Sequence, residues 1–215
     1  MTNAPQTSAS TNNGPALAVC WSCKGPVAWG GLFCDTCKAV QPPVPLDHFA
    51  RLGLKRDFDI KVPVLDQLYF GFQRQLHPDR FAAAAPKAKQ ISQSQAVAFN
   101  EAYETLKDPL TRAAYLLDLL GEKVEGEGAH TIADEELLME QLERREALME
   151  ADNPAAVEAI ARQAKLDAEA ALSALASDFA SGDKIAAKRG YLRLKYLVKL
   201  GEEARARRAR LTLAR

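Results

Sequence analysis

Long apolar runs and an excess of one charge are both missing from this 215-residue sequence. No stretch approaches the roughly 20 apolar residues that a membrane-spanning helix needs. The 28 Lys and Arg residues are balanced by 28 Asp and Glu residues. A general nucleic-acid binder usually carries a basic surplus, because phosphate contacts dominate its affinity. We therefore expect neither a membrane nor a nucleic acid among the partners.

Catalytic motifs are also lacking. The sequence contains no G-x-x-x-x-G-K phosphate-binding loop, no G-x-S-x-G nucleophile motif and no Cys/His nucleophile pair. No residue is therefore available to carry an enzyme hypothesis, and we expect that the protein is not an enzyme.

Basic residues are absent from the N-terminal segment. Residues 1–15 are rich in Thr, Ser, Asn and Ala and contain no Arg or Lys, unlike a secretory signal or an Arg-rich transit peptide. We interpret residues 1–17 as the disordered tail of a cytoplasmic, bacterial protein. If the chain is a processed form, the expected location is the mitochondrial matrix.

All four cysteines lie in residues 18–40, as two C-x-x-C pairs separated by ten residues. Two such pairs supply the tetrahedral four-sulfur shell that Zn²⁺ prefers in closed structural sites. A segment this small cannot hold a core alone, so metal binding would supply most of its folding free energy. We predict one structural Zn²⁺ per chain, held by Cys20, Cys23, Cys34 and Cys37. A rubredoxin-like iron site and a pair of disulfides are the alternatives, and a cytosolic redox poise disfavours the disulfides.

After the cysteines, the sequence is helical in pattern and falls into two units. A Pro-rich spacer at 41–45 precedes the first unit, since proline fixes φ and restrains the residue before it. A Gly-rich linker at 121–131 separates the two units. Apolar periodicity and stop signals predict seven helices, at about 47–52, 62–75, 86–106, 110–120, 134–149, 154–181 and 184–211. We expect an all-α fold, with a small bundle formed by the last three helices.

The tripeptide His77-Pro78-Asp79 lies between two of the expected amphipathic helices. Three residues are a weak match on their own, and the structural context strengthens it. A short helix, a longer helix, a His-Pro-Asp loop and another helix follow one another, and this order resembles that of a J-domain.

Longer stretches resemble the HscB family of J-domain co-chaperones. The matching stretches are 48–54, 72–81, 100–117 and 138–146, which resemble the J-domain opening, the second helix and loop, the stretch that leads into the linking helix, and the scaffold-binding helix. The resemblance covers about residue 46 to the C-terminus. Longer family members carry an N-terminal tetracysteine module similar to residues 20–37.

The resemblance implies a J-domain helical hairpin at 46–120, a C-terminal three-helix bundle at 132–215 and a small zinc-knuckle module before them. The His-Pro-Asp loop would dock on a DnaK/HscA-class chaperone and stimulate its ATPase, and the bundle would bind an IscU-type iron–sulfur scaffold protein. The residues at the family's chaperone-binding positions are Arg74, His77, Pro78, Asp79 and Arg80. Those at its scaffold-binding positions are Leu138, Met139, Leu142, Glu143, Glu146 and Tyr196.

The chain departs from the family in the charge of the second helix. J-domains usually carry several basic residues there, whereas this helix has Arg74, with Arg80 just beyond the loop. We therefore expect weaker electrostatic steering toward the chaperone. A zinc-ribbon nucleic-acid-binding protein and a general J-protein chaperone are the alternative functions. Zero net charge disfavours the first, and the absence of a Gly/Phe-rich linker and of several zinc repeats disfavours the second.

Two helices of the expected bundle, at 134–149 and 184–211, carry more apolar residues than one stripe can hold. Either both helices are central and fully buried, or part of the surplus is a solvent-facing patch of the kind that marks a partner site. The two alternatives stay open on the sequence alone.

Overall fold

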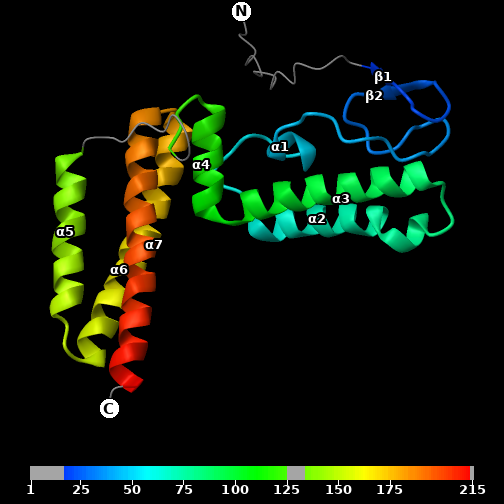
Figure 1. Ribbon diagram of the computed structural model, residues 1–215. Coiled ribbons are helices and arrows are strands. Elements are labelled where there is room, and N and C mark those ends of the chain that lie inside the picture. The colour runs from blue at the N-terminus through cyan, green and yellow to red at the C-terminus, as the bar shows by residue number, and fades with distance from the viewer. Residues whose placement is uncertain (1–16, 125–133, 214–215) are drawn as a thin grey trace, which may run out of the picture. The chain divides into compact units, whose positions relative to one another are not determined.

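A computed structural model describes residues 17–124 and 134–213 of the chain (Figure 1). These residues form two compact units, of which the first contains residues 17–56 and 60–107 and the second contains the remainder. None of the helices in the described part combines the length and the apolarity that crossing a membrane requires. Residues 1–16 of the tail expected at 1–17 and most of the linker expected at 121–131 lie outside the described residues, whereas Leu17 is the first residue of a strand.

The first unit begins with the tetracysteine module, which we define as residues 18–40. Strand β1 (Leu17–Val19) pairs antiparallel with β2 (Pro26–Ala28), and Phe33 forms an isolated bridge with Val40. The small core of this module consists of Val27 and two of the cysteines. Such a core is too small to stabilise a fold alone, as expected from the sequence.

The rest of the first unit is a helical hairpin. Helix α1 (His48–Arg51) precedes α2 (Val62–Leu76), and α3 (Pro86–Lys107) returns along α2. Aromatic pairs hold the two long helices together, with 3.9 Å between the ring centroids of Tyr69 and Tyr103 and 4.2 Å between those of Phe72 and Phe99. The turn between α2 and α3 begins with η1 (Pro78–Phe81), a 3₁₀ helix that the apolar pattern did not predict.

The second unit contains α4 (Pro109–Leu119), α5 (Glu135–Glu150), α6 (Pro154–Ser181) and α7 (Lys184–Leu213). Asp108, Asp134 and Asn153 begin three of these helices, because each side chain accepts a hydrogen bond from an amide of the first turn. Gly182 ends α6 with a φ of 76°, which glycine adopts without strain.

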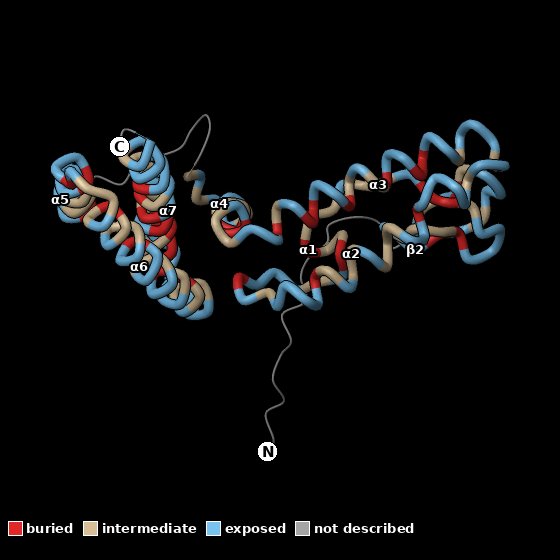
Figure 2. The backbone as a smooth tube through the Cα atoms, turned by 90° about the horizontal axis from the view of Figure 1, so that it is seen from below, coloured by how far each residue is buried: buried red, intermediate tan, exposed pale blue. Residues whose placement is uncertain are grey.

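Helices α6 and α7 pack along most of their length and form the core of the bundle (Figure 2). The residues buried between them include Val157, Ala164, Ala171 and Leu175 from α6 and Tyr191, Leu194, Leu197 and Leu200 from α7. Phe58 belongs to this unit too, since its ring stacks on that of Phe179 at 5.1 Å and lies 5.0 Å from the Arg112 guanidinium.

The all-α prediction is confirmed, and each of the seven helices lies within about two residues of its expected bounds. Helix α4 groups with the second compact unit, although the expected J-domain extended to residue 120. The domain boundaries read from the sequence therefore stay predictions.

Substitution of Leu175 by Ala should destabilise the second unit, because this side chain is fully buried. Removing a buried Leu side chain costs about 2–5 kcal/mol of the free energy of unfolding. Chemical denaturation should show that loss, whereas Leu166→Ala, a change at a position 54% exposed on the same helix, should alter stability by about 0.5 kcal/mol or less. Equal losses in both variants would contradict this packing.

Candidate functional site

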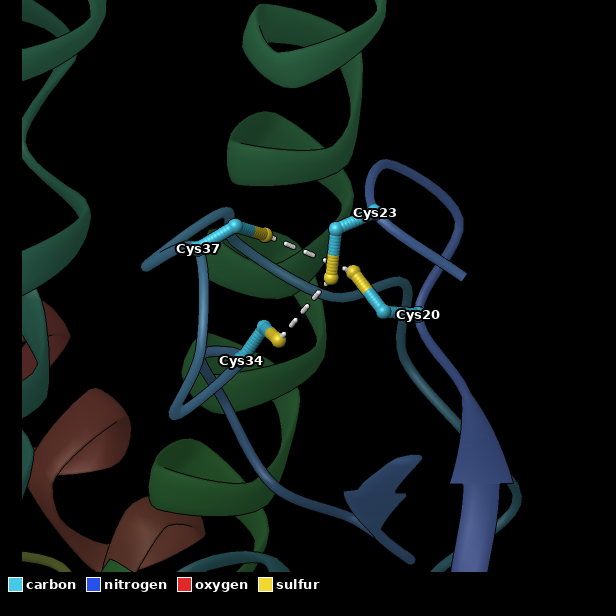
Figure 3. Close-up of side chains that lie close together, drawn as sticks. All are labelled: Cys20, Cys23, Cys34 and Cys37. Atoms are coloured by element: carbon cyan, nitrogen blue, oxygen red, sulfur yellow. Dashed lines mark hydrogen bonds between the residues drawn. The ribbon is translucent and has the colours of Figure 1, made fainter. Parts of the chain in front are cut away.

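The four cysteines lie on two tight turns that repeat one hydrogen-bond pattern (Figure 3). In the first turn, the amide of Lys24 donates to the carbonyl of Cys20 at 3.1 Å, and the amide of Cys20 donates to the carbonyl of Gly25 at 2.9 Å. The second turn makes the two equivalent bonds, each at 2.9 Å. Each turn thus presents both of its sulfurs on one side, toward the other turn.

Lys24 and Lys38 follow the second cysteine of each pair and have left-handed backbones, with φ values of 64° and 61°. A residue with a Cβ pays about 1–2 kcal/mol for this conformation. The same strained conformation therefore recurs at the equivalent position of both turns.

The sulfur atoms form a compact group. The Sγ atoms of Cys20 and Cys37 are 3.7 Å apart, those of Cys23 and Cys34 are also 3.7 Å apart, and all four lie within 4.8 Å of one another. A disulfide would require about 2.05 Å. A tetrahedron of sulfurs around an ion at about 2.3 Å has edges of about 3.8 Å. The four cysteines are therefore placed to hold one metal ion.

The pKa values of Cys20 and Cys23 are shifted in opposite directions. Burial disfavours the Cys20 thiolate, but amide hydrogen bonds from Cys23 and Ser22 outweigh burial, and the pKa of Cys20 falls to about 6. The amide of Gly25 favours the Cys23 thiolate, but the neighbouring sulfurs and burial outweigh it, and the pKa of Cys23 rises to about 11. Four adjacent thiols cannot all ionise without a cation between them, and a bound metal supplies that charge.

The second candidate site is the His-Pro-Asp tripeptide at the turn between α2 and α3. His77 ends α2 and caps η1, where its Nδ1 accepts from the amide of Asp79 at 3.3 Å. The tripeptide is exposed, whereas the preceding Leu76 is buried and its carbonyl accepts from the Ser92 hydroxyl at 3.1 Å. The exposed turn thus begins at Leu76, a buried residue whose carbonyl is held by a hydrogen bond, and we call this residue with Ser92 the base of the turn.

The two basic residues expected beside the tripeptide are exposed as well. Arg74 lies in the last turn of α2, and Arg80 lies in η1. The structure therefore brings all five expected chaperone-binding residues to one end of the hairpin, and their role stays a prediction.

The third candidate site is the outward face of α5. Leu137 and Leu148 bury their side chains in the bundle, whereas Leu138, Met139 and Leu142 are 51%, 55% and 51% exposed. Glu143 and Glu146 are exposed on the same helix. We call these five exposed residues the α5 face.

Ion pairs compensate for the small apolar contact between α5 and the bundle. Arg144 lies 2.8 Å from Glu140 and 2.6 Å from Asp167 of α6, and the Arg193 guanidinium of α7 also reaches Glu140 at 2.8 Å. Pairs with α7 recur along the helix, from Arg189–Glu136 at 2.5 Å to Arg145–Glu203 at 3.0 Å. The charged side chains on the inner side of α5 thus have partners on α6 and α7. The apolar residues of the α5 face remain exposed to solvent or available to a partner.

Tyr196 is partly buried on α7. It lies one turn after Arg193 and two turns before Glu203, and both of these residues pair with α5. Helical spacing therefore places Tyr196 on the side of α7 that faces α5. Of the other large apolar residues of α7, four are buried and three are at least 37% exposed, so the apolar surplus of this helix is partly core and partly surface.

Sequence reasoning missed two buried glutamines in the first unit. Gln41 is 6% exposed and Gln95 is 4% exposed, and both make hydrogen bonds around the cysteine group. For Gln95 a signal was available, because it lies four residues from Ile91 and from Phe99 on the buried stripe of α3. Gln41 follows the last cysteine in a Pro-rich stretch and has no such periodicity.

Known proteins resemble this chain over most of its length. A family model described as the HSCB C-terminal oligomerisation domain matches residues 133–205. The iron–sulfur cluster co-chaperone protein HscB of Mus musculus is 34% identical over 189 residues, or 86% of this chain and 80% of the mouse protein. A co-chaperone protein HscB homolog of Aeromonas salmonicida is 37% identical over 162 residues, or 74% of this chain and 94% of that protein.

Solved structures agree with these matches. The crystal structure of human co-chaperone protein HscB has a TM-score of 0.80 at 30% identity, and covers 88% of this chain and 98% of the human chain. Chaperone HscB from Vibrio cholerae has a TM-score of 0.65 at 32% identity, and covers 77% of this chain and 99% of its own. The mammalian relatives therefore match more of this chain than the bacterial ones do.

Purified protein should contain about one metal ion per chain, because the four sulfurs close one tetrahedral shell. Elemental analysis should show this ratio for the unaltered chain and a strongly reduced one for Cys20→Ser. The matched control is Ser22→Ala, a change at an exposed side chain on the same turn, which should keep the metal. Metal-free protein with two disulfides by mass spectrometry would contradict the assignment.

Proposed function

The chain belongs to the HscB family of co-chaperones, and on that basis we propose that it delivers an iron–sulfur cluster scaffold protein to a DnaK/HscA-class chaperone and stimulates that chaperone's ATPase. Its proposed place is in iron–sulfur cluster assembly and transfer, and the mouse relative is named as an iron–sulfur cluster co-chaperone. The strongest support is that both expected contact surfaces are exposed and lie in different compact units of one chain.

The chaperone contact is assigned to the exposed tripeptide and its two arginines. The base of the turn is fixed by the hydrogen bond between Ser92 and Leu76, so docking would cost little conformational entropy. Arg74 and Arg80 provide positive charge for an acidic chaperone surface. The chain itself supplies no catalytic group in this scheme, and ATP hydrolysis is carried out by the chaperone.

The scaffold contact is assigned to the α5 face together with Tyr196. Burial of an exposed Leu or Met side chain contributes about 1.5–3 kcal/mol, so three half-exposed ones supply a useful part of a binding energy. Glu143 and Glu146 beside them add charge that can select a basic partner surface. Both contacts on one chain raise the effective concentration of the scaffold at the chaperone, which is delivery in physical terms.

We assign zinc to the four cysteines. An all-thiolate tetrahedral shell suits Zn²⁺, and four protein ligands leave no open position for chemistry. The metal would therefore have a structural role, in a module whose own core is small.

Substitution of His77 by Gln should abolish stimulation of the chaperone's ATPase and leave the fold and scaffold binding intact. The side chain is exposed and contributes little to the core, so its loss should affect the contact with the chaperone and not the stability of the fold. Steady-state ATPase assays and thermal melts measure both effects, with the exposed Gln93→Ala change on α3 as the control. Normal stimulation by His77→Gln, or a melting temperature lower by many degrees, would count against the assignment.

Combined substitution of Leu138, Met139 and Leu142 by Ala should weaken scaffold binding at least tenfold, which corresponds to roughly 1.4 kcal/mol or more. Stability should fall by far less than the 2–5 kcal/mol expected for each buried Leu, because the three side chains are about half exposed. Titration calorimetry and denaturation test these two expectations. The control is Leu166→Ala with Ile185→Ala, which are exposed apolar positions on α6 and α7. A triple variant that melts early and still binds would place the scaffold elsewhere.

A further inference from the structure

Gln41 occupies a central position between the cysteine group and helix α3. It follows Val40, the buried last residue of the tetracysteine module, and is 6% exposed. Burial of a polar side chain is costly unless each of its polar groups finds a partner, so the partners of Gln41 indicate what the residue does.

The side-chain amide of Gln41 is oriented by two acceptors. Its Nε2 lies 3.3 Å from the Sγ of Cys20 and 2.7 Å from the carbonyl oxygen of Ala39. An amide NH₂ group has two hydrogens to donate, and here each has one acceptor. The amide oxygen could satisfy neither of them, because a carbonyl and a thiolate only accept. The nitrogen therefore points at the cysteine ligand.

The backbone of Gln41 makes two further bonds, in different directions. Its N–H donates to the carbonyl of Leu32 inside the tetracysteine module at 2.9 Å. Its carbonyl accepts from the Nε2 of Gln95 on α3 at 2.8 Å, in a bond between buried groups. One residue thus contacts a metal ligand on one side and the hairpin on the other.

Helix α3 continues the connection to the end of α2. Ser92 lies one turn before Gln95 on the buried side of α3, and its hydroxyl donates to the carbonyl of Leu76. Leu76 directly precedes His77. A second contact joins the same parts, since the Lys87 ammonium in the first turn of α3 lies 4.9 Å from the centre of the Trp21 ring, between the first two cysteines.

We propose that Gln41 is a positioning residue that couples metal binding at the four cysteines to the α2–α3 hairpin, through Cys20 on one side and Gln95 on the other. With metal bound, the ion holds the Cys20 sulfur in place, and with it the acceptor of the hydrogen bond from Gln41. Gln41 then holds its carbonyl in place for Gln95. Metal binding to the tetracysteine module then stabilises α3 and the base of the exposed turn. A module that makes no contact with the hairpin would not have this effect.

A glutamine that only satisfies the carbonyl of Ala39 is the simpler role, and it makes a different prediction. In that case Gln95, which touches no cysteine, would have no effect on the metal. Under the coupling, a change at Gln95 reaches the metal through Gln41, because the two effects must be reciprocal.

The test uses the full chain with Gln41→Met and Gln95→Met, which keep side-chain length and remove the donor. The control is Gln93→Met, at an exposed position on α3. Zinc affinity is measured by competition with a chelator, the sulfur-to-metal charge-transfer band is recorded with Co²⁺, and amide hydrogen exchange of residues 86–107 is followed with and without Zn²⁺.

Gln41→Met should lower zinc affinity 10- to 100-fold, the usual loss when a residue hydrogen-bonded to a ligand is changed, and should shift the Co²⁺ charge-transfer band. Gln95→Met should lower zinc affinity at least threefold with an unshifted band, and zinc should no longer slow exchange around residues 91–95. The control should match the unaltered chain throughout.

Three results would overturn the coupling: no zinc binding by the unaltered chain, exchange in α3 that does not respond to zinc, or a zinc affinity of Gln95→Met equal to that of the control. If Gln41→Met does not fold, Gln95→Met decides alone, since it lies on the hairpin and away from the metal. None of these measurements involves the chaperone or the scaffold.

Discussion

A helix packed on one side can bury only one stripe of its side chains, and this constraint decides which of its apolar residues stay exposed. In α7 the stripe faces α6 and contains Tyr191, Leu194, Leu197 and Leu200. In α5 the buried stripe is reduced to Leu137 and Leu148, and ion pairs link the helix to α6 and α7. Leu138, Met139 and Leu142 have no core to enter and are the apolar part of the α5 face.

The sequence predicted those features that follow from regular spacing. Apolar residues repeating at three and four positions located the helices, and the two C-x-x-C pairs located a cysteine group whose sulfurs indeed converge. Spacing alone could not predict that Leu138 is exposed and that Leu194 is buried, because both belong to apolar-rich helices and only tertiary packing separates them. For Leu138 it was the resemblance to the family that supplied the expectation. The same limit applies to α4, whose contacts group it with the second unit.

Buried polar contacts were the other feature that could not be predicted from the sequence. Gln41 lies next to prolines and reads as part of a spacer, yet its backbone and side chain contact Leu32, Ala39, Cys20 and Gln95. These partners are separated from it by 2 to 54 positions along the chain, so no local pattern marks them. Through these contacts the cysteine group and the hairpin form one compact unit.

The proposed delivery requires one chain to present both contact surfaces. The most direct measurement is the chaperone's ATPase rate at limiting scaffold, with an equimolar mixture of His77→Gln and the Leu138, Met139 and Leu142 triple-Ala variant in place of the unaltered chain. Each variant retains one surface, and linkage on one chain is what raises the effective concentration of the scaffold. The mixture should therefore fail to restore the rate that the unaltered chain gives. Full restoration by the mixture would contradict delivery, since the two surfaces would then act independently.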